Sequence, residues 1–205
     1  MRTVVDVKVV DKDVKLPEER KTSAETLEAD TLEVLADLNH ASQKGLQTMF
    51  DSSVGRSTVN HPLGGRYQIT PTEASVQKLP VQYGVTTTAS VIAQGFNPYI
   101  AEWSPYHGAA YAVIEATARL VAVGANWSKA RFSYQEYFER MDKKAERFGQ
   151  PVSALLGSIE AQIQLGLPSI GGKDSMSGTF EELTVPPTLV AFGVTTAAVS
   201  YTHLT

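Results

Sequence analysis

Apolar residues recur at intervals of three and four positions over much of this chain of 205 residues. This spacing places apolar side chains on one side of a helix. It predicts helices over 26–38, 42–50, 104–124, 134–148 and 151–165, the first two either separate or broken near Asn39.

The helices over 104–124 and 151–165 have the clearest boundaries. Each has a proline in its first turn, Pro105 or Pro151, and each ends at a glycine. An alanine strip on the first helix predicts a close approach to a sheet or another helix: Ala109, Ala112 and Ala116. The side of the second helix that we expect to be buried carries Leu155, Leu156, Ile159 and Ile163.

Strands are predicted where β-branched residues are dense, over 4–10, 83–93 and 188–199. A loop is expected over 51–65, and the prolines and glycines around 68–80 predict an irregular segment there. Strands interspersed with helices indicate an α+β (α/β layered) domain.

Composition and charge narrow the class of protein. With 42% hydrophobic and 20% charged residues, the chain has a globular composition. The net charge of -4 argues against a nucleic-acid binder, and no apolar run is long enough for a membrane helix. The lack of cysteine excludes disulfides, thiolate metal sites and a cysteine nucleophile. We therefore expect a cytoplasmic protein with neither nucleic acid nor membrane as a partner.

The run from Gly171 to Gly178 carries more chemistry than a packed core needs. It combines glycines, which let a backbone approach a ligand, with Lys173, which can neutralise a phosphate, and Asp174, which can hold a divalent metal. The run lacks the spacing of a P-loop. A glycine turn between two strands, with solvated charges, is the alternative.

Three charged residues elsewhere also have two interpretations. Glu73 has no basic neighbour in sequence and by itself predicts a surface carboxylate. Glu115 lies one helical turn before Arg119, which predicts an ordinary ion pair. The same side chains can also serve a phosphate or metal site.

Four segments, in this order, resemble a known enzyme family. They are Asp51-Ser-Ser-Val-Gly, Gln68-Ile-Thr-Pro-Thr-Glu-Ala-Ser-Val, the helix with Glu115, and Ser169-Ile-Gly-Gly-Lys-Asp-Ser-Met-Ser. They are similar to phosphoribosylformylglycinamidine synthase, a large multidomain amidotransferase of purine biosynthesis. The resemblance implies a fragment with the second of two nucleotide-binding domains of the aminoimidazole-ribotide-synthetase type.

The resemblance also implies domain boundaries and a fold. Residues 1–34 would be the end of a preceding domain and a linker, 35–199 the nucleotide-binding domain, and 200–205 a non-native tail. The domain would have a mixed β-sheet packed by helices, resembling the N-terminal domain of aminoimidazole ribotide synthetase.

The site residues follow from the same resemblance. Glu73, Glu115 and Asp174 would be magnesium ligands, with Glu73 standing where the family usually has aspartate. Arg119 replaces an asparagine ligand and cannot bind a cation. The residues implied to contact nucleotide are Gly171, Gly172, Lys173, Ser175, Ser177 and Arg119.

The implied reaction converts formylglycinamide ribonucleotide, glutamine and ATP to the amidine, glutamate, ADP and phosphate. Mg²⁺ and ATP or ADP would be the cofactors, and the partners would be the remaining domains, including a glutaminase domain. The family releases ammonia with a cysteine, which this chain lacks. The resemblance implies a largely structural nucleotide site, and without that cysteine we expect the isolated fragment to be inactive. Aminoimidazole ribotide synthetase, selenophosphate synthetase and a non-catalytic interaction domain are the alternatives.

Overall fold

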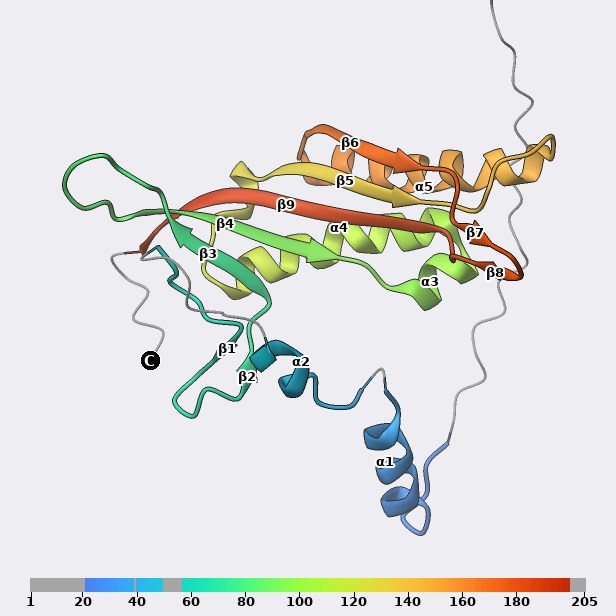
Figure 1. The fold of residues 1–205 in the computed structure, drawn as a ribbon, viewed down its shortest axis with the longest axis horizontal. Helices are drawn as coiled ribbons and strands as arrows, with labels where there is room; N and C mark the ends of the chain where they lie inside the picture. Colours follow the sequence, from blue (N-terminus) through green and yellow to red (C-terminus); the bar gives the residue numbers. More distant parts are fainter. Residues whose placement is uncertain (1–20, 39, 50–56, 200–205) are drawn as a thin grey trace, which may run out of the picture.

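A computed structural model describes residues 21–38, 40–49 and 57–199 of the chain. The strand predicted over 4–10 and the tail over 200–205 lie outside the described residues, as do residues 51–56 of the loop predicted over 51–65. Figure 1 shows a sheet with two long helices behind it, and two short helices, α1 and α2, away from this body.

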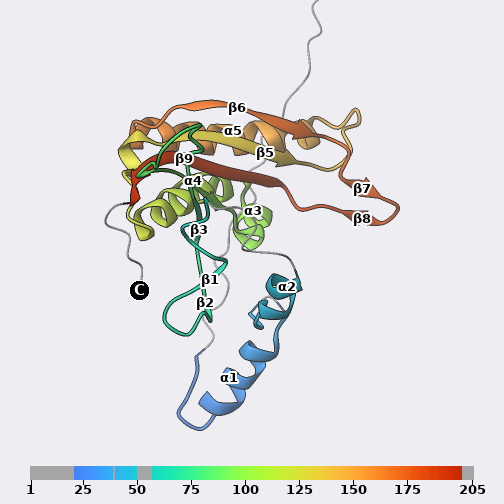
Figure 2. The ribbon, with the colours of Figure 1, turned by 60° about the vertical axis from the view of Figure 1, so that its left-hand side comes forward.

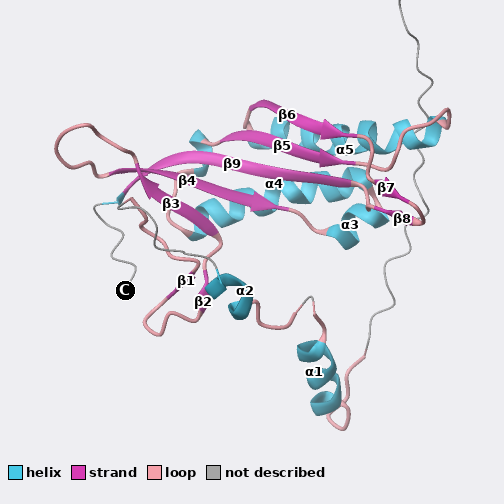
Figure 3. Cartoon of the chain, viewed as in Figure 1, coloured by secondary structure: helices cyan, strands magenta, loops and turns pink. Residues whose placement is uncertain are grey.

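The sheet has five strands in the order β3-β4-β9-β5-β6 (Figures 1 and 3). Their bounds are Ala74–Lys78 for β3, Thr88–Gly95 for β4, Thr188–Ala198 for β9, Arg131–Tyr137 for β5 and Ser169–Ser175 for β6. Neighbouring strands are antiparallel except β5 and β6, which are parallel. The predicted mixed sheet is therefore confirmed, and β9 confirms the strand predicted over 188–199.

Helices α4 (Pro105–Ala122) and α5 (Ala145–Leu165) pack together on one face of the sheet (Figure 1). α4 lies against β4 and β9. A short helix, α3 (Pro98–Trp103), begins where the Asn97 side chain accepts hydrogen bonds from two backbone amides, and it leads into α4. The largest fully buried side chains between sheet and helices include Phe132, Phe138, Leu120, Val91 and Val113.

Helix α4 confirms the helix predicted over 104–124. Its first turn is capped by Ser104, whose hydroxyl accepts a hydrogen bond from the backbone N–H of His107 at 3.3 Å. The predicted alanine strip is buried. It allows the backbone of β4 to come so close that a methyl group on Gly95 would overlap the carbonyl oxygen of Ala112.

The helix predicted over 134–148 is wrong for its first part. Residues up to Tyr137 form β5, and α5 begins only at Ala145, six residues before Pro151, where we expected the next helix to begin. Phe132 and Tyr134, two positions apart, are both buried, and this period of two is the pattern of a half-buried strand. The two predicted helices are therefore one helix with a proline inside it.

The predicted buried side of α5 is also wrong. Leu155, Leu156, Ile159 and Ile163 are exposed, and Ile163 reaches 72%. The buried positions are mostly small, with Gly157 and Ser158 among them. A methyl group on Gly157 would overlap the carbonyl of Tyr106, so close packing against α4 selects small residues and turns the large apolar ones outward.

Two further segments are more regular than predicted. Within 68–80, expected to be irregular, Ala74–Lys78 forms β3, and β2 (Thr70–Pro71) pairs with β1 (Leu63–Gly64). The glycine run after Pro168 is the edge strand β6. It is followed by a small hairpin of β7 (Thr179–Phe180) and β8 (Leu183–Thr184).

The two predicted N-terminal helices are present as separate elements, α1 (Leu27–Ala36) and α2 (Lys44–Met49). Neither buries a residue, and both lie apart from the sheet in two views (Figures 1 and 2). A one-turn 3₁₀ helix, Trp127–Lys129, connects α4 to β5. In the described ranges no helix is long and apolar enough to cross a membrane.

Candidate functional site

The predicted site residues form two groups at opposite edges of the sheet. Asp174 and its neighbours lie on β6, one edge strand, with Ser177 just beyond it. Glu73 precedes β3, the other edge strand, and contacts Arg119 of α4. Four strand spacings of about 4.8 Å separate these edges by roughly 19 Å. Glu73 and Asp174 of one chain therefore cannot ligate the same ion, and Arg119 does not reach the β6 residues.

The first group is an ion-pair cluster centred on Arg119. Its Nε lies 2.9 Å from Oε2 of Glu73, and its Nη2 lies 2.8 Å from Oε1 of Glu115. Its Nη1 donates to the carbonyl oxygen of Gln94 at 3.0 Å. The second oxygen of Glu115 accepts from the backbone N–H of Phe96 at 2.8 Å. Every nitrogen of the guanidinium thus has a partner, and Glu115 is fixed from two sides.

A cavity of about 400 Å³ lies beside this cluster. Its walls include Glu73, Arg119 and the polar side chains of Asn60 and Gln77. A second cavity of about 390 Å³ shares Asn60 and Glu73 and extends along β1 and β2. Volumes of this size suit small molecules.

The Arg119 guanidinium lies between the Glu73 and Glu115 carboxylates, at the position that a metal ion shared by the two would take. Across the described ranges, no group of three or more histidine, aspartate or glutamate side chains lies together in a way that could hold a metal ion. The metal roles of Glu73, Glu115 and Asp174 therefore stay predictions.

The second group centres on Asp174 and a residue that the sequence did not point to, Glu136. These two residues are paired in register across β5 and β6, so their side chains share one face of the sheet. Glu136 is only 3% exposed, and its Oε2 has no hydrogen-bond partner. Burial, and then the charge of Asp174, raise the pKa of Glu136 from 4.5 to about 7.

This second group fits a divalent cation in its chemistry. It offers carboxylate oxygens, which magnesium prefers, and one of them is buried without a partner. Glu136 was missed because its segment was predicted to be a helix. The alternation of Phe132, Tyr134 and Glu136 is the pattern that could have found it.

Gly172 of β6 has a packing role that is independent of any ligand. A methyl group on Gly172 would come within 2.9 Å of the carbonyl oxygen of Tyr134 on β5. Gly171 has a φ of 139°, beside the register shift between the strands. Further along, the hydroxyls of Ser175 and Ser177 lie 3.4 Å apart. Lys173, Ser175 and Ser177 remain predicted nucleotide contacts.

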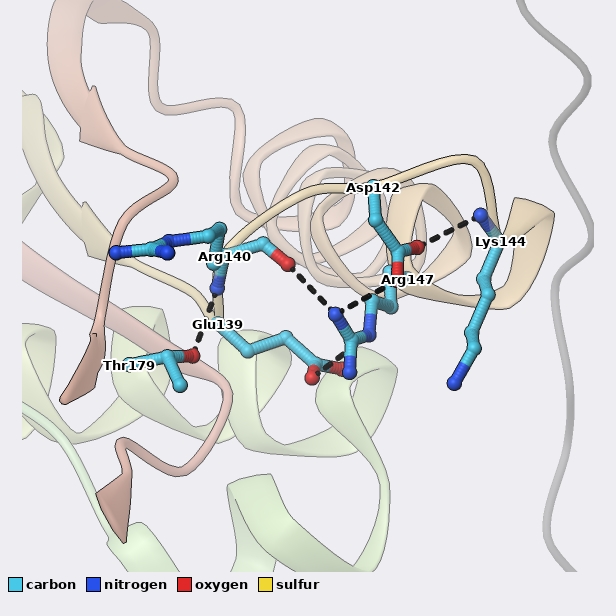
Figure 4. Close-up of polar contacts among 6 residues, drawn as sticks. All are labelled: Glu139, Arg140, Asp142, Lys144, Arg147 and Thr179. Carbon is cyan, nitrogen blue, oxygen red and sulfur yellow. Dashed lines mark hydrogen bonds and ion pairs between the residues drawn. The ribbon is translucent and has the colours of Figure 1, made fainter. Parts of the chain in front are cut away.

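A second arginine cluster holds the connection between β5 and α5 (Figure 4). Arg147 of α5 contacts Glu139 and Asp142, each at 3.0 Å, and also donates to the carbonyl oxygen of Arg140. The backbone N–H of Arg140 in turn donates to Oγ1 of Thr179 at 2.9 Å. The cluster thereby ties this connection to β7, next to the end of β6.

The fold defines the class of this domain. A mixed sheet with α4 and α5 on one face is the architecture of the aminoimidazole-ribotide-synthetase-like fold, and this chain has that fold. The sequence matches no protein-family model and no curated protein.

Solved structures with this fold come from phosphoribosylformylglycinamidine synthase of Thermotoga maritima. The PurLQS structure aligns with a TM-score of 0.65 and 18% identity, over 94% of this chain and 28% of that chain. PurL complexed with ATP aligns with a TM-score of 0.61 and 16% identity, over 93% and 27%. Phosphoribosylformylglycinamidine synthase II aligns with a TM-score of 0.53 and 18% identity, over 69% and 21%. The chain thus spans just over a quarter of the first two chains.

Proposed function

We propose that this chain is a nucleotide-binding domain of a phosphoribosylformylglycinamidine synthase. The observation that carries the proposal is the alignment of 94% of the chain with the T. maritima PurLQS structure. Structures of T. maritima PurL with ADP, ATP and AMPPCP support nucleotide as the ligand. The whole enzyme would be an ATP-dependent carbon–nitrogen ligase that takes nitrogen from glutamine.

Within that enzyme the domain binds nucleotide and supplies no catalytic residue. Lys173, Ser175 and Ser177 contact phosphate, because an ammonium and two hydroxyls can pair with its oxygens. Asp174 supplies a carboxylate for Mg²⁺, whose role is to neutralise the phosphates. The chain has no cysteine for the family's release of ammonia, so the isolated domain is inactive.

The remaining domains of the synthase are the partners in this proposal. The outward stripe of α5, formed by Leu155, Leu156, Ile159 and Ile163, supports this, since large exposed apolar surfaces mark interaction sites. A cytoplasmic location is part of the same proposal.

The second candidate is a non-catalytic interaction domain that binds no nucleotide. The contacts of Arg119 favour it, because they close the Glu73–Glu115 pair to a metal ion.

Calorimetric titration of MgADP into the whole chain tests the two candidates. Asp174→Asn should abolish the heat of binding, whereas Glu102→Gln, which removes the same charge from an exposed position on α3, should leave it unchanged. Equal binding by all three proteins would contradict the role of Asp174. A wild-type chain that binds no MgADP would favour the interaction domain.

A further inference from the structure

The Arg119 cluster has the geometry of a cation site in which the cation is an arginine side chain of the protein itself. Glu73 enters from the start of β3 and Glu115 from α4, and both carboxylates converge on one guanidinium at 2.9 and 2.8 Å. Carboxylates that converge from separate elements are the arrangement that holds a divalent cation. Here the positive charge comes from a side chain instead.

Each member of the cluster is held by a further contact. The carbonyl oxygen of Gln94 binds Nη1 of Arg119, and the backbone N–H of Phe96 binds the other oxygen of Glu115. Gln94 and Phe96 flank Gly95, the residue whose backbone touches α4. The cluster is therefore anchored to a close contact between β4 and α4, and the Arg119 side chain is 29% exposed.

We propose that Arg119 is an internal counterion that replaces a divalent cation between Glu73 and Glu115, so that this edge of the domain binds no metal. A divalent ion would either meet the positive charge of Arg119 at contact distance or have to break both ion pairs to displace it. The planar fork of arginine suits two carboxylates at once, which lysine or water could not do as well.

This inference goes beyond the proposed function, because it concerns the edge of the sheet opposite Asp174. It holds whether or not the chain binds nucleotide. The two ideas can fail separately if metal binding is measured without nucleotide and in a protein that lacks the Asp174 carboxylate.

The test measures Mn²⁺ binding to the whole chain by electron paramagnetic resonance of the free ion. Every protein in this test carries Asp174→Asn. The protein with Arg119 intact should not bind Mn²⁺. Arg119→Asn should raise Mn²⁺ affinity about tenfold or more, because it releases two carboxylates and adds an amide oxygen. Adding Glu73→Gln to Arg119→Asn should remove the gain.

Arg131→Asn is the matched control. Among the described residues, Arg131 donates to the backbone carbonyls of Lys129 and Ala130 and pairs with no carboxylate, so its loss should create no affinity. Circular dichroism establishes that each variant is folded, and Arg119→Gln provides a second variant if Arg119→Asn is not.

Two results would overturn the proposal. One is Mn²⁺ binding with Arg119 intact that Glu73→Gln abolishes. The other is a folded Arg119→Asn or Arg119→Gln variant with no gain in Mn²⁺ affinity.

Discussion

Glu136 places a carboxyl group where the core would accept an apolar side chain. It is the third inward-facing position of β5, after Phe132 and Tyr134, and it is almost fully buried. Asp174 is its register partner on β6, and Tyr134 precedes it on the same side of β5. A buried carboxyl without a full set of partners favours its neutral form.

The stability of the chain should therefore depend on the protonation of Glu136. The folded state keeps the proton up to about pH 7, whereas the unfolded chain loses it near pH 4.5. The contribution of Glu136 to stability falls as pH rises between these values and is constant above them. Glu136→Gln does not titrate, so its stability relative to wild type should increase by about 2–3 kcal/mol between pH 5 and 8.

Urea unfolding at several pH values, in buffer without divalent cations, measures this difference. Asp174→Asn is the control, because it removes the lesser cause of the raised pKa and keeps the burial. It should reduce the pH dependence without abolishing it. A constant difference between Glu136→Gln and wild type from pH 5 to 8 would contradict the prediction.

At the scale of single residues, the sequence indicated which side chains form the site better than it indicated where they lie. It singled out Glu115 and Arg119, and an ion pair between them was the simpler of two interpretations, which the 2.8 Å contact confirms. Residue patterns alone left Glu73 as a surface carboxylate, and only the family resemblance grouped it with Glu115 and Arg119, because the contact of Glu73 with Arg119 joins residues far apart in the chain. Neither local spacing nor residue type encodes such a contact.

At the scale of elements, α5 shows that close packing can bury the small residues of a helix and leave its large apolar residues exposed. Its buried side touches α4 through small residues, and the backbone at Gly157 lies against the carbonyl of Tyr106. Periodicity correctly predicted a helix here. It predicted the wrong buried side, because the close contact with α4 accepts only small residues.

Gly157→Ala should therefore destabilise the chain by about 2 kcal/mol, since the added methyl group forces two backbones apart. Thermal unfolding measures the loss. Gly45→Ala on α2 is the matched control, because a methyl group there meets nothing within 4 Å. It should cause no loss of stability. Equal effects of the two substitutions would mean that α4 and α5 can separate without cost.

The connection between β5 and α5 depends on Arg147 (Figure 4). The apolar spacing of the sequence predicted a helix through this segment. It gave no sign of the contacts of Arg147 with Glu139 and Asp142, because these residues do not have the spacing of neighbours on a helix. The side chain of Arg140 points away from the cluster, and only its backbone takes part.

Arg147→Ala should release this connection, since it removes two ion pairs and a hydrogen bond to the Arg140 carbonyl. Hydrogen exchange at the amide of Lys144, which is bonded to Asp142, should become about tenfold faster. Arg140→Ala should leave that rate unchanged. Equal acceleration in both variants would show that charge, and not the cluster, controls the segment.

At the scale of the whole molecule, the exposed apolar surfaces are as informative as the core. Fold class and the helices and strands over 104–124 and 188–199 could be predicted from sequence, because long periodic or β-branched stretches determine them. Which faces remain open could not, because that depends on how elements pack. The α5 stripe and the unburied α1 are the clearest examples.

The isolated chain should self-associate through the α5 stripe. Replacing Leu156, Ile159 and Ile163 by glutamine should lower the apparent mass in light scattering, because it removes exposed apolar area whose burial between chains drives association. The same change at Leu27, Leu32 and Leu35 of α1 is the comparison. A larger effect of the α1 variant would assign self-association to the N-terminal helix.

The position of β9 also determines when this domain can form during synthesis. β9 is the last strand along the described chain, yet it lies between β4 and β5 and pairs with both. Until residues 188–198 have left the ribosome, the β3–β4 hairpin and the β5–α5–β6 unit have no strand to join them. The sheet can therefore close only after residues 188–198 have been made, because no other strand lies between β4 and β5.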